Sequence, residues 1–285
     1  MTPLISSLLL LHFGPPDQAS ARKELVVQVG SQNRTCILHT PSQLAQKKPL
    51  PVVIALHGGM GTGASMEAKT GFSTLADREG FLVAYPDGIA GPGGKGSWNV
   101  GWVDSYSSRQ KTDDVAFLKK LIEVVIEKHH ADPQRVYLTG GSNGGMMTHV
   151  MAAKYPKLCA AVAVVVASVP LDYEPPKSPV PILFINGDAD EEIPFDGGMS
   201  RNALVKARQQ KPFTPISELV AKWAKANGAV DKPVVSREGS VVTNTYAATK
   251  SGAETVFILL EGTGHGWPAR DFVATNAVWE FFKRH

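Results

Sequence analysis

A tight turn around one serine is the feature that most constrains how this chain can fold. In VYLTGGSNGGMMTHVMAAKY, residues 136–155, a short apolar run ends in a glycine cluster and a stretch with helical spacing follows. A strand that passes straight into a helix is the basic unit of α/β folds. Residues 52–69, VVIALHGGMGTGASMEAK, have the same arrangement around a second glycine-rich turn. Both segments therefore predict strands of a largely parallel sheet.

The rest of the chain continues this alternation. Runs typical of strands occur at 23–29, 34–40, 52–57, 81–88, 135–140, 160–168, 180–187, 241–248 and 254–262, and helical spacing occurs at 65–80, 112–130, 143–155, 214–228 and 271–285. Only a turn separates the first two strand runs, which predicts antiparallel leading strands. The pattern predicts a single domain over residues 22–285 with a mostly parallel, doubly wound sheet, and the order of its elements fits an α/β-hydrolase. Residues 88–111, rich in Gly, Ser and Trp, are expected to form a long functional loop.

Composition disfavours several classes of function. The 285 residues are 43% hydrophobic and 19% charged with a net charge of +3, as in ordinary soluble globular proteins. The densest basic stretch, VKARQQK at 205–211, is interpreted as a solvated helix face and not as a nucleic-acid patch. Cys36 and Cys159 form no CxxC pair and are interpreted as buried thiols. Neither a nucleic-acid partner nor stable membrane insertion is expected, and the oligomeric state stays open.

The N-terminus resembles a secretory leader. MTPLISSLLLLHFGPPDQASA contains an apolar run of signal-peptide length, a Pro-Pro break and an Ala-Ser-Ala cleavage pattern, although no basic residue precedes the run. The run is too short to span a bilayer. We therefore expect a signal peptide over residues 1–21 and a secreted or periplasmic protein, with a cytoplasmic protein as the alternative.

The glycine-rich turns could in principle bind a phosphate. Gly59, Gly61 and Ala64 fit the pattern G-x-G-x-x-A between a strand and a helix, and Asp87 could contact a ribose. The spacing to Asp87 is long, however, and the motif follows the third strand instead of the first. A dinucleotide-binding oxidoreductase is therefore the weaker alternative.

A nucleophilic serine explains more of the chain. Residues 140–144 match G-x-S-x-G, which would hold Ser142 on a sharp strand-to-helix turn. A serine hydroxyl needs a base and an acid, and in α/β-hydrolases the acid and then the histidine follow at later strand ends. Asp188 and Asp190 come after one such strand and His265 after another. Asp190 is favoured over Asp188, because the chain must turn back before it reaches the histidine.

An oxyanion site is also expected. Its two backbone N–H groups would come from Asn143, the residue after the nucleophile, and from the loop after the third strand. In that loop, HGGMG, Gly59 is the favoured donor and Met60 the alternative.

Three tryptophans, Trp98, Trp102 and Trp267, are expected near the predicted site. They are candidate substrate-binding residues that could stack on an aromatic or sugar-linked acyl group. The alternative is that they pack the long loop onto the core. The chemistry requires no metal and no organic cofactor.

Taken together, several segments resemble the polyhydroxybutyrate depolymerase and feruloyl esterase group of α/β-hydrolases. They are residues 113–147, 184–198, 217–228, 261–268 and 278–285, and the similarity runs from about residue 33 to the C-terminus. The resemblance implies a serine carboxylesterase with Ser142 as nucleophile, Asp190 as acid and His265 as base. It also implies Asp190 over Asp188, since Gly187 to Asp190 matches the G-x-x-D turn of the family.

The resemblance suggests two kinds of substrate. They are feruloyl or acetyl esters of plant polysaccharides, and poly(3-hydroxybutyrate)-type polyesters and their oligomers. Members of the group often carry cysteines just after the SWN segment, whereas this chain reads SWNVGWVDSYSS. The loop next to the acyl pocket therefore differs from the family pattern. A peptidase on the same fold is a further alternative.

Overall fold

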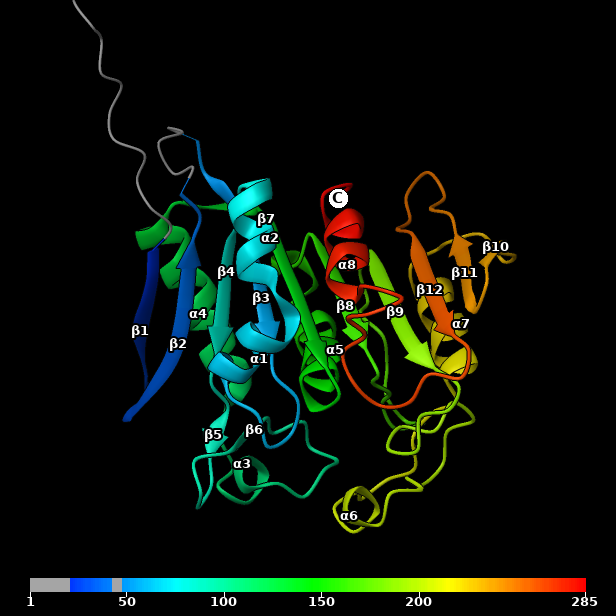
Figure 1. Cartoon of the computed structure of the whole chain (residues 1–285), viewed down its shortest axis with the longest axis horizontal. Coiled ribbons are helices and arrows are strands. Elements are labelled where there is room, and N and C mark those ends of the chain that lie inside the picture. Colours follow the sequence, from blue (N-terminus) through cyan, green and yellow to red (C-terminus); the bar gives the residue numbers. More distant parts are fainter. Residues whose placement is uncertain (1–20, 43–47) are drawn as a thin grey trace, which may run out of the picture.

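A central sheet runs through the whole protein, with helices on both of its faces (Figure 1). The computed structural model describes residues 21–42 and 48–285. The strand order is β1-β2-β4-β3-β7-β8-β9-β12-β11-β10. In that order the strands are β1 (Ala21–Val29), β2 (Gln32–Thr40), β4 (Leu82–Pro86), β3 (Leu50–Leu56), β7 (Ala131–Gly141), β8 (Ala161–Val165), β9 (Ile182–Gly187), β12 (Thr255–Leu260), β11 (Val241–Tyr246) and β10 (Val234–Glu238).

The middle of the sheet is parallel and its two edges are antiparallel. Strands β4, β3, β7, β8, β9 and β12 pair in parallel. Strands β1 and β2 form the antiparallel leading edge, and β11 and β10 form the other edge. The predicted α/β-hydrolase fold with antiparallel leading strands is therefore confirmed. The sequence pattern missed β10, because all of its side chains are exposed and no apolar run marks it.

Each face of the sheet carries its own core. Alternate residues of one strand enter different clusters, since successive side chains point to opposite faces. Val52, Ile54 and Leu56 of β3 belong to one cluster, and Val53 and Ala55 belong to the other. The first face is covered by α4 (Asp114–His129), α5 (Asn143–Lys154) and α7 (Ile216–Ala226), and the second by α1 (Gly63–Thr70), α2 (Phe72–Glu79) and α8 (Ala274–Phe282).

Short elements depart from the predicted pattern. The helix expected over 65–80 is divided into α1 and α2 at Gly71, whose φ of 67° ends the first helix in the left-handed region. The long loop at 88–111 contains β5 (Ile89–Ala90), β6 (Gly96–Ser97) and α3 (Tyr106–Arg109). Two further short elements are the 3₁₀ turn η1 (Pro156–Leu158) and α6 (Ala203–Lys206).

The predicted leader lies outside the described residues, except for Ala21, which begins β1. Across 21–42 and 48–285, no helix is both long and apolar enough to cross a bilayer. Cys36 and Cys159 are free and buried, and burial raises the pKa of both thiols, that of Cys159 to about 12.

Candidate active site

Ser142 occupies the turn between the end of β7 and the start of α5. Its backbone has φ 53° and ψ −122°, a region that non-glycine residues rarely adopt. The turn is held by two hydrogen bonds, from Ser142 N–H to the carbonyl of Val165 (3.0 Å) and from Met146 N–H to the carbonyl of Ser142 (2.9 Å). This strained strand-to-helix turn has the form of a nucleophile elbow.

Glycines on either side allow that turn to form. A Cβ on Gly140 would lie 2.4 Å from the carbonyl carbon of Gly144. A Cβ on Gly144 would lie 2.3 Å from the carbonyl oxygen of Leu56, at the end of β3. The backbone at Gly140 therefore packs directly on the backbone at Gly144, and Gly144 packs on the end of β3. Neither position has room for a side chain, which explains the glycines of G-x-S-x-G.

Asp190 and His265 meet because they follow adjacent parallel strands. In the register of β9 and β12, Gly187 pairs with Leu260. Beyond these ends, His265 Nδ1–H donates to Asp190 Oδ2 at 2.8 Å. The second oxygen, Asp190 Oδ1, accepts the backbone N–H groups of Glu192 and Ile193, both at 2.8 Å. The Asp190 side chain is fully buried, so these bonds fix both its oxygens.

Asp188 has a different position. Its Oδ1 accepts the backbone N–H of Gly262 at 2.6 Å, which ties the end of β9 to the loop after β12. Within the described structure, Asp190 is the carboxylate bound to His265 Nδ1, and Asp188 is not.

The HGGMG loop lies against the turn that carries Ser142. A Cβ on Gly58 would be 3.5 Å from Ser142 Cβ, and one on Gly59 would be 3.8 Å from Asn143 Cβ. Neither Gly59 N–H nor Met60 N–H has a hydrogen-bond partner within the described residues. Asn143 is the first residue of α5, and the first N–H groups of a helix have no intrahelical acceptor. The expected oxyanion donors are therefore close together, and their N–H groups are available.

His57, which was not among the predicted site residues, contacts this loop and holds it in place. Its Nδ1–H donates to the carbonyl of Gly58 (2.7 Å), and its Nε2 accepts the N–H of Gly88 (2.9 Å). Burial lowers the pKa of His57, which keeps the ring neutral in this donor–acceptor arrangement. The signal for this role was the histidine directly before the two glycines.

The Asn143 side chain joins the Ser142 turn to the long loop. Its Oδ1 accepts Trp98 N–H at 2.7 Å, and its Nδ2 donates to the Trp98 carbonyl at 3.2 Å. Trp98 in turn donates from Nε1 to the carbonyl of His57 at 2.8 Å. The loop over 88–111 therefore supports both sides of the expected oxyanion site.

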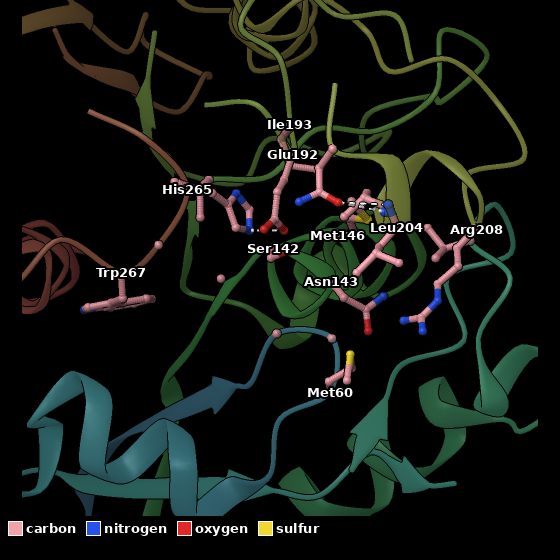
Figure 2. Close-up of a pocket in the computed structure, with 18 of the residues that line it drawn as sticks. Met60, Ser142, Asn143, Met146, Glu192, Ile193, Leu204, Arg208, His265 and Trp267 are labelled. Carbon is pink, nitrogen blue, oxygen red and sulfur yellow. Dashed lines mark hydrogen bonds and ion pairs between the residues drawn. The ribbon is translucent and has the colours of Figure 1, made fainter. Parts of the chain in front are cut away.

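Ser142 and His265 line one cavity of about 420 Å³ (Figure 2). Its walls are mainly apolar, and the larger apolar side chains are Met60, Met66, Met146, Ile193, Leu204, Phe213 and Trp267. Much of the wall comes from residues 202–213, which include the segment 205–211 that was interpreted as a solvated helix face. Only Ala203–Lys206 is helical there, and Arg208 lines the cavity.

The three tryptophans divide between wall and packing. Trp267 lines the cavity, and its Nε1 donates to Thr275 Oγ1 at 2.9 Å. Trp98 has no exposed surface and packs against the His57 ring with the centroids 4.9 Å apart. Of the residues described around the cavity, neither Trp98 nor Trp102 forms part of the lining. For these two, packing of the loop onto the core describes their position.

Asp87, the acidic residue of the dinucleotide-binding alternative, has a structural position in this protein. Asp87, which could have contacted a ribose, accepts Gly63 N–H (2.7 Å) and the Thr35 hydroxyl (2.8 Å). Its carboxylate therefore holds the start of α1. In the part of the chain that the structure describes, no three His, Cys, Asp or Glu side chains are grouped so that they could hold a metal ion.

Comparison with known proteins gives a consistent assignment. The family model described as "Esterase PHB depolymerase" matches residues 35–173. "Putative esterase NocK" of Nocardia uniformis subsp. tsuyamanensis is 32% identical over 92% of this chain and 78% of its own length. "Feruloyl esterase B" of Piromyces equi is 29% identical over 84% of this chain, which spans 45% of that protein.

A solved structure supports the fold. The acetyl xylan esterase from Aspergillus awamori matches with a TM-score of 0.67 at 20% sequence identity, covering 93% of this chain and 100% of the other. The family match and the 32% identity to an esterase over most of both chains place this chain in the esterase and PHB depolymerase family of α/β-hydrolases, as a carboxylic ester hydrolase.

Proposed function

We propose that this protein hydrolyses carboxylic esters through Ser142, His265 and Asp190, by way of an acyl-enzyme. The observation that carries the proposal is the 2.8 Å bond between His265 Nδ1 and a fully buried Asp190, beside a cavity that Ser142 also lines. Because Nδ1 donates to Asp190, Nε2 of the neutral ring is free to accept a proton.

The proposed reaction has two steps. Ser142 Oγ attacks the ester carbonyl while its proton passes to His265 Nε2, and the Gly59 and Asn143 N–H groups stabilise the oxyanion. Collapse breaks the bond to the alcohol oxygen, which takes the proton from His265. Water then attacks the acyl-enzyme, giving its proton to Nε2, and the acid leaves as Ser142 regains a proton.

In the free protein, the Glu192 carboxylate lies close to Nε2. His265 Nε2 lies 3.3 Å from Glu192 Oε2 (Figure 2), and no hydrogen bond joins His265 to Ser142 Oγ within the described residues. Catalytic hydrogen bonds often tighten only when substrate binds. In this proposal the Ser142–His265 bond forms as an ester displaces the Glu192 carboxylate.

For the substrate we propose feruloyl or acetyl esters of plant polysaccharides, or hydroxybutyrate polyesters and their oligomers. The names of the family, of the Piromyces equi feruloyl esterase and of the Aspergillus awamori acetyl xylan esterase support these classes. A mainly apolar cavity is compatible with an acyl chain or an aromatic ring. Methyl ferulate, acetylated xylan and hydroxybutyrate oligomers, compared by kcat/KM, would rank them.

A serine-directed fluorophosphonate tests the catalytic assignment. We expect one adduct, on Ser142, and loss of both labelling and 4-nitrophenyl acetate hydrolysis in Ser142→Ala. An adduct elsewhere, or unchanged hydrolysis in that variant, would refute the role of Ser142.

We also propose that residues 1–21 are a cleaved secretory leader. The support is the apolar run followed by Ala19-Ser20-Ala21. Intact-mass measurement of the exported protein should show the chain starting after Ala21. A chain that stays in the cytoplasm at full length would rule out this leader.

A further inference from the structure

The candidate active site contains cationic side chains with no anionic partner. Lys69, in the last turn of α1, and Arg208 both line the cavity, and neither forms an ion pair with any described residue. Glu192 is the only carboxylate among the described lining residues, and its Oε2 lies 3.3 Å from His265 Nε2. Part of the cavity is therefore positively charged and not neutralised by the protein.

The backbone of Arg208 is firmly placed. Its carbonyl accepts Asp104 N–H at 2.7 Å, and the Trp102 carbonyl accepts Gln210 N–H at 3.1 Å. Between them, the buried Gln209 side chain accepts Ser200 N–H (2.7 Å) and donates to two backbone carbonyls. These bonds anchor the segment that carries Arg208 to the long loop.

Asp104, whose backbone N–H bonds the Arg208 carbonyl, already pairs its carboxylate with another arginine. The Asp104 carboxylate accepts from Arg109 at 2.9 Å. Among the described residues, the Arg208 guanidinium therefore has no carboxylate partner, and Figure 2 shows its side chain extending along the cavity beside Leu204. In the same view, Ser142 lies between His265 and Arg208, and Trp267 lies beyond His265 on the side away from Arg208.

The positions of His265, Ser142 and Arg208 determine how an ester would be oriented in the cavity. The alcohol oxygen must lie by His265, because that ring protonates it as it leaves. The acyl chain then extends away from His265, toward the end of the cavity that holds Leu204 and Arg208. Leu204 and Met146 can contact methylene groups, and a guanidinium at the end can bind a carboxylate through two parallel N–H···O bonds.

We propose that the site also accepts esters whose acyl group ends in a carboxylate, that is, hemiesters of aliphatic dicarboxylic acids, and that Arg208 binds this carboxylate. The inference rests on the proposed esterase function and names a substrate class for the same site. Arg208 is then a specificity-determining residue and has no role in bond cleavage.

Two 4-nitrophenyl esters test the proposal, the hemiester of adipic acid and the ester of hexanoic acid. They share a leaving group and a six-carbon acyl chain, and they differ in the terminal carboxylate. Spontaneous hydrolysis is subtracted for each. In Arg208→Gln, the ratio of kcat/KM on the adipate to that on the hexanoate should fall about tenfold, as expected for a lost charge-assisted contact. Arg208→Lys should retain part of the preference.

Lys206→Gln is the matched control, since Lys206 is exposed on the same short segment and is not among the described lining residues. We expect its ratio to equal that of the wild type. An unchanged ratio in Arg208→Gln, or the same fall in Lys206→Gln, would overturn the proposal.

A binding measurement separates this inference from the esterase proposal. Monomethyl adipate is titrated into Ser142→Ala and into Ser142→Ala combined with Arg208→Gln. The Kd should rise about tenfold in the double variant. Equal affinities would overturn the role of Arg208 even where hydrolysis proceeds normally. Absence of hydrolysis with the expected affinity difference would instead refute only the catalytic assignment.

Discussion

Replacing Asp190 with asparagine should abolish most of the activity without disturbing the shape of the site. Asp190 Oδ1 accepts two backbone N–H groups at 2.8 Å, and Oδ2 accepts His265 Nδ1–H at 2.8 Å. In Asp190→Asn, the amide oxygen must stay with the two backbone donors, because an NH₂ group cannot accept from them. The amide NH₂ then faces His265.

That orientation selects the wrong form of the histidine. Facing a donor, Nδ1 must act as an acceptor, so the proton moves to Nε2, which can no longer take one from Ser142. Loss of the correct tautomer costs about 10⁴-fold in kcat in the Ser-His-Asp enzymes, or about 5 kcal/mol of transition-state stabilisation. KM should change little, because Asp190 is buried and is not among the described residues that line the cavity.

Asp188→Asn provides the matched control in a 4-nitrophenyl acetate assay. Among the described residues, Asp188 accepts one hydrogen bond, from Gly262 N–H at 2.6 Å, and an asparagine oxygen can accept the same bond. We expect kcat within about twofold of the wild type for this variant. Near-ultraviolet circular dichroism should match the wild type for both. Activity of Asp190→Asn within tenfold of the wild type, or a larger loss in Asp188→Asn, would refute the tautomer argument.

Three further outcomes follow from burial and close packing. Gly144→Ala should lower Tm and kcat together, since its Cβ would lie 2.3 Å from the Leu56 carbonyl oxygen, and overpacking costs about 1–3 kcal/mol; an unchanged Tm would contradict this contact. Burial lowers the pKa of His149 to about 3, and neither of its ring nitrogens has a partner among the described residues. Because the unfolded chain binds this proton more tightly, the free energy of unfolding should fall by about 1.4 kcal/mol per pH unit as pH drops from about 6.5 toward 3. Urea titrations should show a shallower pH dependence in His149→Phe, and an equal slope would exclude His149 as its source. Cys36 and Cys159 should react with a thiol reagent only after denaturation, because both are buried; rapid labelling of the native protein would be inconsistent with that burial.

The alternation of apolar runs and helical stretches was enough to predict the central fold. Strands such as β3 and β8 are buried along their whole length, and continuous apolar runs are the local signal for such strands. Strand β10 has five exposed residues, and α6 has only four residues in all. Such elements form through pairing or loop contacts that no local pattern encodes, so the sequence did not reveal them.

Asp188 and Asp190 differ in a way that only the folded chain shows. Both follow β9, and sequence order with family resemblance favoured Asp190 without placing either side chain. The choice depends on where the turn after β9 meets the loop after β12, which follows from the register of two strands about 70 residues apart in sequence. Similarly, Trp98 and Trp267 look equivalent as residues, yet one is buried against His57 and the other lines the cavity.

The sequence alone determined the α/β-hydrolase architecture and the candidate residues Ser142, Asp190 and His265 in their order. It could do so because strand periodicity and the glycines of a sharp turn are local properties of the chain. Tertiary structure decided which side chains surround that serine, among them Glu192 beside His265 and Arg208 at the far end of the cavity. Their placement depends on contacts between loops that are distant in sequence, and no local sequence pattern encodes such contacts.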